Sequence, residues 1–409
     1  MKHILLAGVP HSTNLGDGLI AMTVNQLIRT CGEYTVTNFD LTAGLYRETP
    51  VRSGSVQRLD GGPALTREYK LNEVSVKKKL TPDFLRYMKS YSVHKRKDAV
   101  LGEQIRELVT QADAVLIGGG HLFIDTYLSF PIAMRRLVRE VKRQGKPLHV
   151  VFVGMRGPWS FLARKWFTDI LHYAKTISVR DEDSLAYLLS IVPSLAHKAV
   201  ALSDPALVTL EAFPGKRAAA NANARPVSVR TLGLGIMDPN EMRRHSPYAW
   251  ERDDCADWWH SLAKGATDGG SRVRVFTNGA DTDNAFVERY IKPRLAGMPG
   301  VEFAPYPGDV GDLVESIRDC DTVIAQRLHA CIPAISFGKP TYGIAWDKKL
   351  ASIFKDLGLS GHVLDFRTDP NAVLAGLVPE KSRQEGSVRI VNQKKRELVT
   401  YVGRILHEA

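Results

Sequence analysis

Cationic side chains follow two consecutive strand-like segments in the second half of the chain. Arg327 and His329 come directly after the apolar run Thr322 to Ala325, and Lys348–Lys349 follows the run Thr341 to Ala345. The carboxyl ends of parallel strands share one edge of a sheet, beside helix N-termini, and open α/β sheets bind ligands there. These residues therefore predict an anion-binding site that contains one group able to move a proton near neutral pH.

A second constellation lies after the first predicted strand. Asn14, Gly16 and Asp17 separate the apolar run His3 to Gly8 from the helical pattern of Leu19 to Arg29. Glycine permits a tight turn, and a helix N-terminus offers free N–H groups to an oxygen ligand. An aspartate there disfavours phosphate and suits a sugar hydroxyl. The three residues are acceptor-site candidates, or else they simply cap the turn and the helix.

A third constellation is glycine-rich. Gly118, Gly119 and Gly120 follow another predicted strand and precede His121, with Asp125 shortly after. Adjacent glycines cost backbone entropy, so either a ligand or a neighbouring element approaches the main chain closely. Asp125 can bind hydroxyl groups or cap a helix. These five residues are further candidates for the cleft.

An arginine completes the set in the first half of the chain. Arg180 follows the strand-like run Thr176 to Val179 and precedes the acidic run Asp181 to Asp183. Arginine is the usual bidentate partner of carboxylate and phosphate, and its place after a strand aims it at the cleft. The acidic neighbours offer the alternative of a structural ion pair.

Several well-known sites are missing from the sequence. It contains no phosphate-binding GxxxxGK[ST] loop, no GxSxG elbow, no HExxH and no paired-cysteine motif. We therefore expect no metal and no bound cofactor. The anion must be held by side chains and helix ends.

Composition indicates a soluble globular protein with anionic partners. The chain has 409 residues, a net charge of +11 and a pI near 9.4, and its length suits two domains. The four cysteines show no CxxC spacing, which fits a reducing compartment. The N-terminal apolar run Ile4 to Val9 is too short for a signal peptide, and no stretch reaches the ~20 apolar residues that span a bilayer. A cytoplasmic location is expected.

A basic segment interrupts the first half. Residues Leu41 to Asp98 form a long insertion rich in Lys, Arg and aromatic residues, and the basic helix Met134 to Gln144 can extend its charge. It is either a solvated loop with helical pieces or a lid or docking surface for an acidic or lipid-linked acceptor at an anionic membrane. No nucleic-acid module accompanies the charge, so nucleic acid is not expected as a partner.

Short buried strands alternate with helical patterns along both halves, which predicts an α/β fold of two doubly wound, Rossmann-like domains with an interdomain cleft. We expect an N-terminal, acceptor-side domain over residues 1–210, a linker at 211–230, a C-terminal, donor-side domain over 231–390, and a C-terminal helix at 391–409 that packs back on the first domain. The expected strands are His3–Gly8, Tyr34–Phe39, Ala114–Ile117, Leu148–Val153, Thr176–Val179, Lys198–Leu202, Leu232–Ile236, Val273–Phe276, Val301–Ala304, Thr322–Ala325, Thr341–Ala345 and His362–Phe366.

These motifs, in this order, resemble the polysaccharide pyruvyl transferase family. The resemblance spans most of the chain, and RLHA with a lysine twenty residues after its histidine is the most specific part. The motifs are NLGD at 14–17, GGGHLF at 118–123, SVRDEDS at 178–184, SDPAL at 203–207 and RLHACIPAISFGKPTYGIAWDKK at 327–349.

The resemblance implies a GT-B-like fold and a reaction. Phosphoenolpyruvate would be the donor, a hexose in a surface glycan or its lipid-linked precursor the acceptor, and the products a pyruvate ketal and phosphate. The family's donor-binding residues correspond to Arg180, His329 and Lys349. Here the family's aromatic residue is Trp346, and the extra Lys348 leaves open which lysine faces the donor.

Reasoning from the residues agrees with that chemistry. Phosphoenolpyruvate carries a carboxylate and a phosphate, which two or three cations among Arg180, Arg327 and Lys349 can hold. His329 is the candidate general acid for the methylene carbon, and Asp17 or Asp125 the candidate base. Alternatively, the cluster is a structural ion-pair network.

Two other functions remain open. A GT-B glycosyltransferase would use a nucleotide sugar and needs an acidic residue that reaches the ribose. A non-catalytic glycan-binding protein of the same fold would not depend on His329. The sequence does not indicate the oligomeric state.

Overall fold

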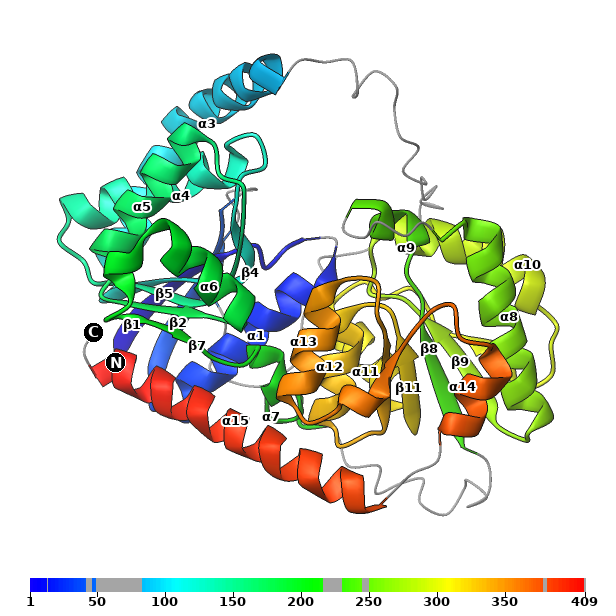
Figure 1. Ribbon diagram of the computed structural model, residues 1–409. Coiled ribbons are helices and arrows are strands. Elements are labelled where there is room, and N and C mark those ends of the chain that lie inside the picture. Colours follow the sequence, from blue (N-terminus) through cyan, green and yellow to red (C-terminus); the bar gives the residue numbers. More distant parts are fainter. Residues whose placement is uncertain are drawn as a thin grey trace.

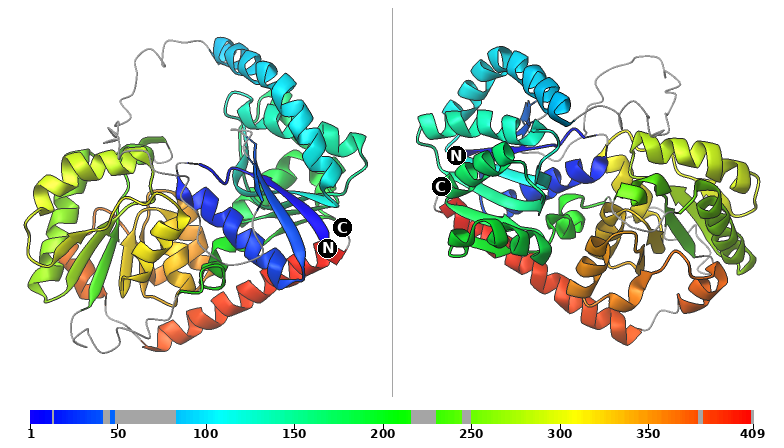
Figure 2. Two further views of the ribbon diagram at one scale, coloured as in Figure 1. Left: turned by 180° about the vertical axis from the view of Figure 1, so that it is seen from behind. Right: turned by 45° about the horizontal axis from the view of Figure 1, so that its top comes forward.

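The structure is a computed structural model that describes residues 1–12, 14–41, 46–48, 83–215, 230–244, 250–377 and 381–407. It contains two α/β domains side by side, and the long helix α15 (Lys381–His407) runs beneath both of them (Figures 1 and 2). Most of the expected insertion at 41–98 and linker at 211–230 lies outside the described residues.

The N-terminal domain is built on a seven-stranded sheet in the order β3-β2-β1-β4-β5-β6-β7, parallel except for β3, which is antiparallel to β2. Its strands are β1 (Lys2–Gly8), β2 (Tyr34–Asp40), β3 (Tyr46–Glu48), β4 (Ala114–Ile124), β5 (Leu148–Arg156), β6 (Thr176–Val179) and β7 (Ala199–Ala201). Its helices are α1 (Leu15–Thr30), α3 (Asp83–Gln111), α4 (Ser129–Arg143), α5 (Phe161–Tyr173), α6 (Glu182–Ile191), η1 (Pro193–Leu195), η2 (Pro205–Val208) and α7 (Thr209–Ala212).

The C-terminal domain has a six-stranded parallel sheet in the order β10-β9-β8-β11-β12-β13. Its strands are β8 (Thr231–Gly235), β9 (Arg272–Phe276), β10 (Val301–Phe303), β11 (Thr322–Ala325), β12 (Thr341–Ile344) and β13 (Val363–Leu364). Its helices are η3 (Pro239–Arg244), α8 (Arg252–Asp268), α9 (Asp281–Phe286), η4 (Val287–Ile291), α10 (Lys292–Leu295), α11 (Val310–Arg318), α12 (Leu328–Ser336), α13 (Lys348–Asp356), η5 (Ser360–His362) and α14 (Pro370–Gly376).

Both sheets have the doubly wound strand order, which confirms the predicted fold class. The chain runs outward from β1 to β2, then crosses back to β4, and it repeats this path from β8 through β9 and β10 to β11. Ligands bind where such an order reverses, outside the carboxyl ends of the strands. The two reversal points lie between β1 and β4 and between β8 and β11.

Strand β4 differs most from its predicted length. It continues through the three glycines to Ile124, where the sequence predicted that the strand would stop at Ile117. Gly119 and Gly120 have φ angles of 79° and 96°, and the pairing with β5 shifts register after Gly120. Glycines with positive φ allow the strand to pass this irregularity and continue.

One hydrophobic core crosses from one domain to the other. It joins Ile20 of α1, Leu207 of η2, Val314 of α11 and Ile332 of α12, which are all buried. The C-terminal half of α15 covers this core through side chains such as Leu398. The interface is therefore tightly packed, and polar groups on it need partners.

Candidate active site

Helix α1 begins at the edge between the two domains. Asn14 caps it, with the side-chain Oδ1 accepting a hydrogen bond from Gly16 N at 3.3 Å. Ser12 Oγ accepts one from Asn14 N at 3.2 Å. The backbone N–H of Leu15 donates to the carbonyl of Asn278 in the other domain at 3.2 Å. Asn14 thus caps the helix, the structural role that the sequence allowed.

The triple glycine brings β4 against α1. An added Cβ on Gly120 would lie 3.0 Å from Asp17 Oδ1, and one on Gly119 would lie 3.1 Å from Ile20 Cγ2. On Gly118 it would lie 2.4 Å from Val151 Cγ2. A side chain at Gly118 would clash with Val151, and side chains at Gly119 and Gly120 would be strained by the positive φ angles and crowded by α1. Asp17 lies directly against Gly120.

His329 reaches this point from the C-terminal domain. It occupies the first turn of α12, and its imidazole lies so close to Gly16 that a Cβ there would be 2.5 Å from Nδ1. Gly16 is therefore a contact surface for the histidine, because any larger side chain would displace the ring.

A buried carboxylate joins the histidine to the predicted arginine. Asp204 Oδ2 lies 3.2 Å from an Nη of Arg180 and 3.4 Å from His329 Nε2, while Oδ1 accepts a hydrogen bond from Ala206 N at 3.0 Å. Burial raises the pKa of Asp204, but His329 and Arg180 lower it more, so the net pKa lies well below its usual range. An ionised Asp204 thus connects the two domains.

Lys349, the second residue of α13, completes the cluster. Its Nζ lies 3.2 Å from His121 Nε2 and 3.9 Å from Asp181 Oδ2. Burial and the nearby Arg180 lower the pKa of Lys349 to about 7, although acidic neighbours oppose them. Burial and the same cations hold the pKa of His121 well below its usual value, so the neutral imidazole accepts from the ammonium group. Lys348, by contrast, is exposed.

Asp17 lies among these cations. Its pKa is raised by burial, which outweighs the opposing effects of His329, Arg180, a hydrogen bond from Ser12 and Lys349. A carboxylate with a raised pKa is a stronger base than a solvated one. The cluster thus combines anion-binding cations with a group suited to accept a proton.

Two of the predicted site residues have partners outside this cluster. Arg327 donates from Nε and an Nη to the buried Asp283 of α9, both at 2.9 Å, which holds it within the C-terminal domain. Asp125 accepts from the backbone N–H of Leu128 and of Ser160, both at 2.9 Å, so its carboxylate fixes the turn after β4.

Three residues at or near the cluster were not predicted as site residues from the sequence. Asp204 lies in the SDPAL motif but was given no role in the site, and Asp181 was considered only as an acidic neighbour of Arg180. Asn278 follows β9 and is 1% exposed, and neither polar atom of its side chain has a partner among the described residues. A buried amide without partners is unusual and marks a polar position beside α1 that the sequence did not single out.

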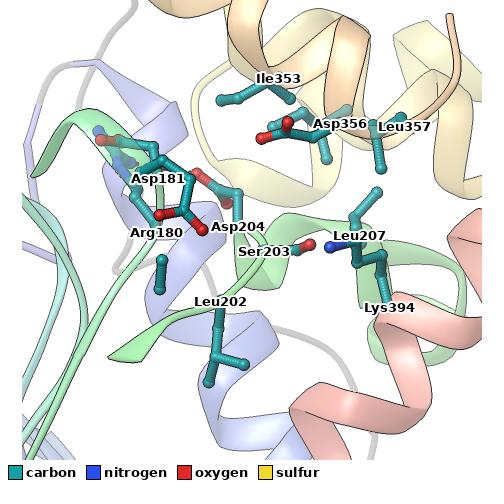
Figure 3. A pocket seen from close by; sticks show the side chains of 13 residues that line it. Arg180, Asp181, Leu202, Ser203, Asp204, Leu207, Ile353, Asp356, Leu357 and Lys394 are labelled. Atoms are coloured by element: carbon teal, nitrogen blue, oxygen red, sulfur yellow. Dashed lines mark hydrogen bonds and ion pairs between the residues drawn. The ribbon is translucent and has the colours of Figure 1, made fainter. Parts of the chain in front are cut away.

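A small cavity of about 40 Å³ lies behind the Arg180–Asp204 pair, with Asp181, Asp356 and Lys394 in its lining (Figure 3). It has room for a few water molecules. A larger cavity of about 390 Å³ lies between the end of α12 and α15, and no predicted site residue lines it. Within the described ranges, no three His, Cys, Asp or Glu side chains gather as a metal site requires.

Solved structures with the same architecture are sugar-nucleotide enzymes of the GT-B fold. One is UDP-GlcNAc 2-epimerase from Neisseria meningitidis bound to UDP-GlcNAc, with a TM-score of 0.57, 11% identity and 100% of each chain covered. Another is an α,α-trehalose-phosphate synthase (UDP-forming) from Burkholderia vietnamiensis, with a TM-score of 0.53, 14% identity and 98% and 96% covered. The fold is therefore GT-B-like, as predicted.

The sequence of the chain identifies the protein family to which it belongs. A family model described as polysaccharide pyruvyl transferase matches residues 14–348, which is most of the chain and contains the whole cluster. No match is found among curated proteins. The protein belongs to the polysaccharide pyruvyl transferase family, a family of transferases.

Proposed function

We propose that the protein transfers pyruvate from phosphoenolpyruvate to two hydroxyl groups of a hexose in a glycan or its lipid-linked precursor. One observation carries this proposal: Arg180 of one domain and His329 and Lys349 of the other converge around Asp17. Only the association of the two domains assembles this set.

The charges of the cluster suit the donor. Phosphoenolpyruvate has a carboxylate and a phosphate on the same carbon, so it needs cations at a fixed separation. Arg180 is fixed by Asp204, yet its buried Nε has no partner among the described residues. Lys349 has a pKa of about 7, and an arriving anion favours its protonated form.

The reaction balances without a further reactant. A proton adds to the methylene carbon of phosphoenolpyruvate, and one sugar hydroxyl attacks the resulting oxocarbenium carbon. A second hydroxyl then displaces phosphate. Two C–O bonds form and one breaks, and the two hydroxyl protons end on the new methyl group and on the released phosphate.

His329 and Asp17 supply the proton transfers. His329, hydrogen-bonded to Asp204, is our general acid for the methylene carbon. Asp17, with its raised pKa, is the base for the incoming hydroxyl. The glycines of β4, which keep the space beside Asp17 free of side chains, belong to the acceptor side.

Acceptor-dependent phosphate release tests this function. Purified protein is incubated with phosphoenolpyruvate and a panel of hexose-containing glycans. We expect release only when a suitable diol is present. Absence of release across the panel, together with a melting shift by UDP-sugars and none by phosphoenolpyruvate, would instead support a nucleotide-sugar glycosyltransferase.

The lysine pair gives a pH-dependent prediction. Lys349 is protonated below pH 7 and loses its charge above it, so kcat/KM for phosphoenolpyruvate should fall as pH rises through about 7. Lys349→Met should lower kcat/KM about 10- to 100-fold and remove this descending limb, because a charged hydrogen bond is lost. Lys348→Met is the matched control and should stay close to wild type, since that side chain is exposed. Equal effects of the two substitutions would contradict the assignment.

A further inference from the structure

Exposed apolar side chains concentrate at one place on the N-terminal domain. Six of the nine large apolar side chains that are exposed in the described chain lie on the first half of α3 or the first turn of α5. Single exposed apolar residues are normal, whereas a concentration of them marks an interaction site. The six are Leu85 (44% exposed), Met88 (65%), Tyr91 (48%), Val93 (45%), Phe161 (82%) and Leu162 (41%).

Basic residues are interspersed with these side chains. Between Leu85 and Arg96 the sequence contains no Asp or Glu, and α5 contains none before Asp169. The cations of this stretch are Arg86, Lys89, Lys95, Arg96, Arg164 and Lys165, of which all but the half-buried Arg86 are exposed. An apolar surface mixed with positive charge matches the interface of an anionic bilayer, where apolar side chains enter the acyl boundary and cations meet headgroups.

The two helix ends are held together by one turn. Tyr87 of α3 donates to Asp125 Oδ2 at 3.3 Å, and the same oxygen accepts from Ser160 N at the start of α5 at 2.9 Å. Arg86 also contacts Tyr127 of this turn through a hydrogen bond and its ring face. Asp125 therefore holds the start of α3 and the start of α5 together as one surface.

This surface lies at the edge of the sheet that carries the candidate site. The turn that fixes it follows β4, the strand whose glycines lie under Asp17, and α5 follows β5. In Figure 1 the first half of α3 projects from the domain on the side away from α15. A flat partner that covers this surface would therefore lie at the same edge of the sheet as Asp17.

We infer that the α3–α5 surface, defined by the apolar and basic residues above, docks the protein on an anionic phospholipid bilayer. The inference rests on the proposed function in one respect, because docking would bring the candidate active site near an acceptor that a lipid anchors in the same bilayer. The positive charge of the surface favours an anionic bilayer over a zwitterionic one. The exposed apolar side chains indicate that the surface inserts into the bilayer and is not held there by charge attraction alone. Among the described helices, none is long and apolar enough to cross a membrane.

Vesicle sedimentation of the full chain tests the inference. Binding to vesicles of phosphatidylcholine mixed with phosphatidylglycerol is compared with binding to phosphatidylcholine alone. We expect binding to the anionic vesicles, and a loss of about tenfold or more in Met88→Glu/Phe161→Glu, because two apolar contacts are replaced by charges that repel the headgroups. The control Leu210→Glu/Val388→Glu changes two exposed apolar residues on α7 and α15 and should bind within about twofold of wild type.

The outcomes are distinct from those of the function test. All four substituted side chains are exposed, so the variants should fold, and unchanged melting confirms that they do. Turnover of a soluble acceptor fragment without vesicles should not change in the α3–α5 variant. The inference would be overturned if the wild-type protein did not bind anionic vesicles, or if the Met88→Glu/Phe161→Glu variant bound them as tightly as wild type. Both outcomes are independent of whether phosphoenolpyruvate is the donor. Equal loss in the control variant would overturn it as well.

Discussion

His329→Gln should lower kcat for ketal formation about 10²- to 10⁴-fold, the range that general acid catalysis contributes. Glutamine can still form a hydrogen bond with Asp204, but its amide is not an acid that can transfer a proton. The histidine lies on the first turn of α12, with its ring against Gly16 and Nε2 3.4 Å from Asp204, so its position is fixed before substrate arrives. Steady-state phosphate release at saturating phosphoenolpyruvate measures the effect.

The pattern of kinetic constants distinguishes proton transfer from binding. Loss of a proton donor lowers kcat and kcat/KM together, whereas loss of a phosphate ligand alone raises KM and leaves kcat unchanged. His197→Gln changes an exposed histidine far along the chain and should have no effect. A His329→Gln enzyme with kcat within tenfold of wild type would remove His329 as the general acid.

Asp204→Asn should lower the free energy of unfolding by about 3–5 kcal/mol, because it leaves the Arg180 guanidinium buried without its counter-charge. The side chains of Asp204 and Arg180 are only 1% and 3% exposed, so solvent does not replace the lost partner. Asparagine keeps the shape of the side chain and can still accept from Ala206 N. The charge is therefore the main difference.

Urea unfolding measures this loss. Asp169→Asn is the matched control, since Asp169 pairs with Lys142 on the surface and should contribute less than about 1 kcal/mol. The folded-state pKa of Asp204 is depressed, so its stabilisation is present above the unfolded pKa of about 3.9 and is lost as pH falls toward the folded value. The variant should lack that acid-dependent loss. A change below 1 kcal/mol would show that Asp204 does not hold the domains together.

Local sequence patterns predicted the architecture well for a physical reason. Buried parallel strands are short apolar runs that end at polar residues, and β11 was predicted residue for residue as Thr322–Ala325. The extension of β4 was not predictable, because its glycines bear no signal that distinguishes a strand irregularity from a loop. Its continuation depends on pairing with β5, a neighbour that the sequence does not place.

The sequence singled out a residue of the cluster only where its type and its place directly after a predicted strand were enough to indicate it. Lys349 rather than Lys348 faces the cluster because Asp347 caps α13 and so sets the rotation of the helix, a detail visible only in three dimensions. The pairing of Arg327 with Asp283 was not predictable, because Asp283 lies on α9, 44 residues away in the sequence. Asp204 was missed because a carboxylate before proline is typical of turns, and its role requires Arg180 and the other domain's His329 together.

The central claim is that this cluster forms a pyruvate ketal from phosphoenolpyruvate. The most direct measurement follows [3-¹³C]phosphoenolpyruvate by NMR during incubation with protein and a hexose-containing acceptor. We predict that the labelled methylene signal is replaced by a methyl signal bound to a glycan ketal, with one phosphate released for each ketal formed. Label that remains as phosphoenolpyruvate with every acceptor, or that appears only as free pyruvate, would contradict the claim.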